Sequence, residues 1–113
     1  MSFETIEAIE RSIKQHKATV DLGAALERLR ANKDFKKIIV EGYFENEAVR
    51  LVHLKADPSM QSAESRRSIE QQMDAIGALN QYLNLLASHA ALAQKQIEVD
   101  EAYRDEILEE DAA

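Results

Sequence analysis

The strongest structural signal in the sequence lies in the stretch IEQQMDAIGALNQYLNLLASHAALAQKQI, residues 69–97. Apolar residues recur in it at steps of three and four with a mean spacing of 3.5 residues, which is typical of a coiled-coil seam. We predict that this seam is an interface with a partner helix. It consists of Ile69, Met73, Ile76, Leu79, Leu83, Leu86, Ala90, Ala93 and Ile97.

The helical pattern extends beyond this stretch on both sides. A single helix from Ser62 to Glu110 would measure about 73 Å at a rise of 1.5 Å per residue. A compact domain of this chain length has a radius of gyration of only about 13 Å. Either the helix breaks, or the protein is an elongated hairpin or oligomer whose long helix is covered by other chains. We favour the second interpretation.

Shorter helices are predicted in the N-terminal half. The first segment carries an apolar stripe at helical spacing, and Ser2 can cap its start. The stripe shifts to another face near Gly23, where we expect a bend or break, and the helix then resumes to about Ala31. The chain stops and restarts just afterwards, with Asp34 able to cap the next helix.

The following segment, DFKKIIVEGYFENEAVRLVHLKADP at residues 34–58, is open to two interpretations. One short helix ending near Gly42 and a second ending before Asp57 fit its apolar spacing. Its β-branched and aromatic residues also suit a β-hairpin with its loop at residues 45–47. We favour helix, because an isolated hairpin is marginally stable in water.

Together these segments predict an all-α protein. We expect a helical hairpin or bundle in which shorter N-terminal helices pack on a long C-terminal coiled-coil-like helix. The chain length allows one domain, residues 1–113. We divide it into shorter helices at 1–57, a turn at 58–65, a long amphipathic helix at 66–97 and an acidic C-terminal end at 98–113.

The net charge of −7 lies at one end of the chain. Residues 1–95 carry 13 basic and 13 acidic residues, whereas residues 96–113 have a net charge of −7. Such blocks often serve as interaction tails, although a solvated helix end that frays against its dipole is the simpler interpretation. The candidate partner-facing residues are Glu98, Asp100, Glu101, Asp105, Glu106, Glu109, Glu110 and Asp111.

Signatures of catalysis and of metal or cofactor binding are missing from the sequence. There is no cysteine, which excludes disulfides, thiolate zinc sites and thiol nucleophiles. The three histidines lack both the Glu-x-x-His and the HExxH pattern. The glycines are isolated, so no phosphate-binding loop can be drawn. We therefore expect a protein that is not an enzyme and has no catalytic residue, metal ligand or cofactor.

Two basic clusters could hold an anion or an acidic partner. We favour a simpler interpretation, in which they form a solvated turn and ion pairs with the acidic end. No aromatic residues interleave with them, and the acidic excess argues against general duplex binding, so we do not expect a nucleic-acid partner. The residues concerned are Arg28, Arg30, Lys36, Lys37, Arg66 and Arg67.

No stretch of the sequence suggests a membrane segment or a signal peptide. The N-terminal residues are charged every few positions, and the apolar runs are far shorter than the roughly 20 residues of a bilayer span. We expect a location in the cytoplasm or within an assembled viral particle.

The segment at residues 34–58, followed by a polar turn and IEQQMDAIGALNQYLNLL, resembles small helical proteins of tailed bacteriophages. The genes of those proteins lie among the structural and packaging genes. The likeness covers about residues 25–110 and includes no catalytic motif. It implies a virion-associated or assembly role and transfers no active-site residue.

The leading functional hypothesis is a non-enzymatic, phage-type assembly protein that self-associates or docks on a larger particle through its long C-terminal helix. One alternative is a small acidic inhibitor or adaptor whose tail mimics nucleic acid. Another is a small DNA-packaging subunit that uses the basic clusters. In the leading hypothesis the partner is protein, either a second copy of the chain or a component of a larger assembly.

Overall fold

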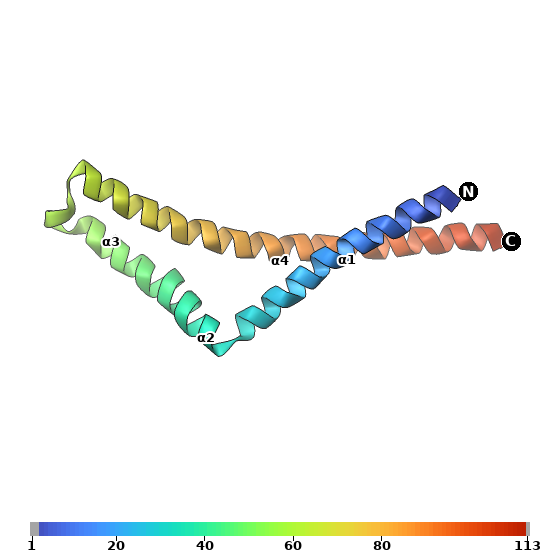
Figure 1. The fold of residues 1–113 in the computed structure, drawn as a ribbon, viewed down its shortest axis with the longest axis horizontal. Coiled ribbons are helices and arrows are strands. Elements are labelled where there is room, and N and C mark those ends of the chain that lie inside the picture. Colours follow the sequence, from blue (N-terminus) through green and yellow to red (C-terminus); the bar gives the residue numbers. More distant parts are fainter. Residues whose placement is uncertain (1–2, 113) are drawn as a thin grey trace. The chain divides into compact units, whose positions relative to one another are not determined.

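Nearly all residues that the structure describes are helical. The computed structural model describes residues 3–112, so the predicted cap Ser2 lies outside the described residues. The elements are α1 (Phe3–Ala31), α2 (Lys33–Phe35), the π-helix η1 (Lys36–Glu47), α3 (Ala48–Ala56), the 3₁₀-helix η2 (Pro58–Met60) and α4 (Ala63–Ala112) (Figure 1). No strand occurs between residues 3 and 112. The predicted all-α fold is confirmed, and the shorter helices pack on the long C-terminal one.

The helices form two compact units. The terminal unit combines residues 1–26 with residues 85–113, and the central unit comprises residues 27–84. Helices α1 and α4 contribute to both units because each continues across the boundary between them.

The terminal unit is an antiparallel pair formed by the first part of α1 and the last part of α4. Ser12 is hydrogen-bonded to Asp100, whereas Gly23 lies beside Ala90, so the two segments run in opposite directions. Figure 1 shows the N- and C-terminal ends of this pair close together. Burial of each core side chain contributes roughly 1.5–3 kcal/mol to the free energy of folding. The core consists of Ile9, Ile13, Ile97 and Ile107, with Ile6 and Val20 packed against it.

Helix α1 continues without interruption through Gly23, so the predicted break there is wrong. The glycine serves a different purpose. A Cβ atom at this position would lie 2.3 Å from the Cβ of Ala90, far inside van der Waals contact. Two small residues therefore allow the backbones of α1 and α4 to approach closely, and this close packing outweighs the low helix propensity of glycine.

In the central unit a continuous helical segment runs antiparallel to the first part of α4. It comprises α2, η1 and α3, and Figure 1 shows α3 beside the start of α4. The ammonium of Lys55 lies 3.6 Å from the carboxylate of Glu70 across the two helices. The core consists of Leu51, Ile69 and Ile76, with Tyr43, Phe44, Ala48, Leu54, Met60 and Met73 packed against it.

Helix rather than hairpin is confirmed for residues 34–56, but its details differ from the prediction. Asn32, not Asp34, is the cap, because its side-chain oxygen accepts hydrogen bonds from the backbone N–H groups of Asp34 and Phe35. The helix does not end near Gly42 and instead passes through it as a π-helix. A Cβ there would lie 3.2 Å from the carbonyl oxygen of Lys37, so glycine fits this tight contact.

The turn before α4 is shorter than predicted. Asp57 accepts hydrogen bonds from the hydroxyl and the backbone N–H of Ser59, and these bonds lower the pKa of its carboxyl. Helix α4 begins at Ala63, where the prediction placed a turn to residue 65. It then continues through Gly77 and through the acidic end to Ala112, which agrees with the single long helix favoured by the sequence.

The two glycines provide a matched test of the close helix approach. Replacing Gly77 with alanine should stabilise the protein by about 1 kcal/mol, because the side chain meets nothing within 4 Å and alanine favours helix. Replacing Gly23 with alanine should instead destabilise it by about 1–3 kcal/mol through overpacking. Urea denaturation followed by circular dichroism measures both, and adding A90G to G23A should restore part of the loss. Equal stabilisation by the two alanines would contradict the proposed packing.

Candidate functional site

The predicted interface residues of α4 pack mostly inside the chain. Ile69, Ile76 and Leu83 are buried in the central unit, and Ala93 and Ile97 are buried in the terminal unit. The remaining members are partly buried, except for Leu79, which is 37% exposed. The seam is therefore covered largely by α1 and α3 of the same chain. Apolar residues on a different face of α4 stay exposed.

That face carries a second apolar row, which the sequence analysis missed. Leu85, Leu92 and Val99 follow one another at seven-residue spacing and are 53%, 64% and 61% exposed. Tyr103, 43% exposed, lies one helical turn after Val99. We call these four residues the outer stripe. The seven-residue repeat is visible in the sequence, but the stronger neighbouring seam conceals it.

A groove of about 400 Å³ lies beside the outer stripe in the terminal unit. His16 and Thr19 of α1 line one wall. His89, Leu92, Ala93 and Gln96 of α4 line the other. Leu92 belongs both to the groove and to the outer stripe, so the two features form one continuous surface.

A hydrogen-bonded cluster ties the two helices together next to this groove. The hydroxyl of Ser12 donates to Oδ2 of Asp100 at 2.6 Å, and the side-chain amide of Gln96 donates to its Oδ1 at 2.8 Å. The pKa of Asp100 is lowered chiefly by the Ser12 hydroxyl. Desolvation works against this effect, while Gln96 and the charge of His16 add to it.

The order of these groups does not suit nucleophilic catalysis. In a hydrolytic triad the histidine stands between the serine and the carboxylate and removes the serine proton. Here Ser12 itself lies between the two, and its proton is held by Asp100. Nδ1 of His16 lies 2.7 Å from the carbonyl oxygen of Ser12, which can only accept, so this nitrogen carries a proton. The cluster therefore fixes the helix pair.

A second groove, of about 460 Å³, lies in the central unit beside η1. Among the six basic candidates, Arg30 and Lys36 line this groove. The other four, Arg28, Lys37, Arg66 and Arg67, are exposed and line none of the grooves described here. The structure therefore brings two of the predicted anion-binding residues together.

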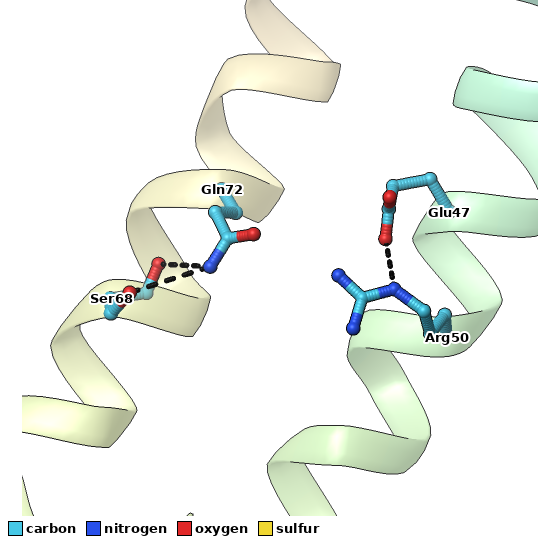
Figure 2. Close-up of polar contacts among 4 residues, drawn as sticks. All are labelled: Glu47, Arg50, Ser68 and Gln72. Carbon is cyan, nitrogen blue, oxygen red and sulfur yellow. Dashed lines mark hydrogen bonds and ion pairs between the residues drawn. The ribbon is translucent and has the colours of Figure 1, made fainter.

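Two polar pairs of the central unit each lie along one continuous helical segment. Figure 2 shows the guanidinium of Arg50 on α3 turned toward Glu47, the last residue of η1. It also shows the amide of Gln72 bonded to Ser68 on α4. These four residues form no shared site across the two helices.

The acidic end of α4 is in part a structural element of the terminal unit. Asp100 is bonded to Ser12, Glu101 is partly buried, and Ile107 is only 1% exposed in the core. The carboxylates on the exposed surface are Glu98, Asp105, Glu106, Glu109, Glu110 and Asp111. Deleting residues 98–113 would therefore remove core packing together with charge.

Between residues 3 and 112 no three histidine or carboxylate side chains gather as a set of metal ligands. Within the same range no helix carries an apolar stretch able to cross a bilayer. No family model, curated protein or solved structure matches the chain. The resemblance to phage structural proteins stays a prediction.

The Ser12–Asp100 hydrogen bond makes the stability of the protein fall as the pH becomes acidic. A carboxyl whose pKa is lowered by folding stabilises the protein above its unfolded value of 3.8, and this contribution is lost as the pH falls through the folded value. We expect S12A to lower the free energy of unfolding by about 1 kcal/mol at pH 7. The difference from wild type should shrink below pH 3.8.

Chemical denaturation at pH 7 and pH 2.5 measures this difference. S88A is the matched control, because Ser88 is an exposed serine of α4 in the same unit. A loss in S12A that is equally large at both pH values would contradict the assigned role of Asp100.

Proposed function

We propose that this protein is a non-enzymatic assembly protein whose terminal unit self-associates through the outer stripe of α4. The observation that carries the proposal is the exposure of Leu85, Leu92 and Val99, each more than half exposed and seven residues apart. Apolar residues at this spacing are the pattern by which helices recognise helices. The resemblance to structural and packaging proteins of tailed phages supports the same kind of role.

The small size of the terminal unit supports the need for a partner. It consists of two helices with a core of four isoleucines. Units below roughly 70–80 residues rarely gain more than about 3–5 kcal/mol from a single core, and natural ones add disulfides or oligomerise. This chain has no cysteine. A second helix pair packed on the first would give a four-helix bundle with a core of ordinary size.

The surface beside the outer stripe can receive side chains from a second copy. The groove is lined by Leu92 and by the small side chain of Ala93. On α1, Leu22 is 55% exposed and follows the groove residue Thr19 by three positions, so the two are neighbours on the helix surface. An apolar side chain of the second copy would sit in this groove as a knob in a hole.

The charge distribution favours an antiparallel pairing of the two α4 helices. Residues 75–94 contain no Asp, Glu, Lys or Arg, whereas the acidic residues gather after Lys95. In a parallel pair the two acidic ends would lie side by side and repel each other. In an antiparallel pair each acidic end lies beside the uncharged segment of the other copy. We therefore place Leu92 near the two-fold axis of the dimer.

Replacing Leu92 or Val99 with glutamate should convert an oligomer into a monomer. Burying an unpaired carboxylate in an apolar contact costs several kcal/mol, which weakens association by roughly 100-fold or more. V52E is the matched control, because Val52 is 55% exposed but lies on α3 in the central unit. Sedimentation equilibrium over a wide concentration range gives the mass of each variant, and circular dichroism checks its helix content.

Wild type and V52E should both show about twice the chain mass of 12.8 kDa. A wild-type monomer at every concentration, or dissociation of V52E equal to that of L92E, would refute the proposal.

A further inference from the structure

The groove of the central unit is built like a binding site for a small molecule. Its volume of about 460 Å³ falls in the range of pockets that hold small ligands. Phe35, Val40, Phe44 and Leu83 give it an apolar lining. Most of its wall comes from η1, which contributes residues four and five positions apart, as suits the wide turn of a π-helix.

The π-helix itself points toward a function. Such helices are rare, occur mostly as single-turn bulges, and are frequent at functional sites. Here the π-helix extends over 12 residues, Lys36–Glu47. Its turns present Val40 and Phe44 to the groove together with the charged residues that follow them.

A partly buried cation, Arg30, lines the groove. One terminal nitrogen of Arg30 donates to the side-chain oxygen of Asn84 at 3.1 Å, which holds the guanidinium in place. Among residues 3–112, no carboxylate lies within ion-pair distance of Arg30 or Lys36. A guanidinium has five N–H donors, so Arg30 has donors left for an anion in the groove.

The two carboxylates of the groove affect the binding of an anion less than Arg30 does. Glu41 and Glu45 line the groove but are exposed to solvent, where water and salt screen their charge. Arg30 is less exposed than either carboxylate, so solvent screens its charge less. The groove therefore combines apolar lining residues with the guanidinium of Arg30.

We propose that the central unit binds a carboxylate with an apolar tail, of the medium-chain fatty acid class, with its carboxylate on Arg30 and its tail between Phe35, Phe44 and Leu83. Lys36 lines the groove as a second, more exposed cation. This site lies wholly within the central unit and is independent of the association of the terminal unit.

Isothermal titration with decanoate and with decanol, both below their micelle or solubility limits, tests the site. The two probes share the tail and differ in the charged head. Decanoate should bind roughly tenfold or more tightly than decanol. A hydrogen bond between Arg30 and a carboxylate contributes more binding free energy than a hydrogen bond between Arg30 and a neutral hydroxyl. R30Q should remove this preference. R28Q is the matched control, since Arg28 lies in the same helix end but does not line the groove.

E45Q supplies a second measurement that does not depend on Arg30. Removing this exposed carboxylate should strengthen decanoate binding by roughly two- to fivefold and leave decanol unchanged. If R30Q loses helix content by circular dichroism, E45Q decides the question. The inference is overturned if decanoate does not bind, if decanol binds equally well, if R28Q acts like R30Q, or if E45Q leaves decanoate binding unchanged.

Discussion

The apolar seam of α4 is the constraint on which the rest of the structure depends. Residues from Ile69 to Ile107 recur along one side of this helix and must be removed from water. In the central unit α3 covers them, and in the terminal unit α1 does so. Helix α1 approaches α4 closely where both helices carry small residues. Gly23 and Ala90 therefore set the spacing between α1 and α4. Covering the seam in this way leaves the outer stripe exposed.

The sequence predicted the helices well because their signals are local. The spacing of Ile69 to Ile97 predicted one long helix, and the Asn32 region predicted the stop before the next one. It could not tell whether the seam packs within the chain or against another chain, since both kinds of contact use the same apolar spacing. Gly23 misled for a related reason: helix propensity describes an isolated helix, whereas close packing is a tertiary effect.

The candidate sites were harder to predict for a physical reason. Arg30 and Leu83 are distant in sequence, and only the antiparallel packing of the central unit places them at one groove. Nothing in the composition of residues 36–47 predicts a π-helix rather than an α-helix. In contrast, the outer stripe was readable from the repeat of Leu85, Leu92 and Val99, once the first seam was assigned to the core.

Engineered cysteines test the self-association of the terminal unit most directly, because the chain has none of its own. An antiparallel pair centred on Leu92 places residue 85 of one copy beside residue 99 of the other. Mixing L85C with V99C under mild oxidation should give the mixed disulfide dimer in large excess over either symmetric dimer, since a disulfide needs Cα atoms about 4.4–6.8 Å apart. Predominant symmetric dimers, or no cross-linking beyond that of a V52C control, would contradict the account.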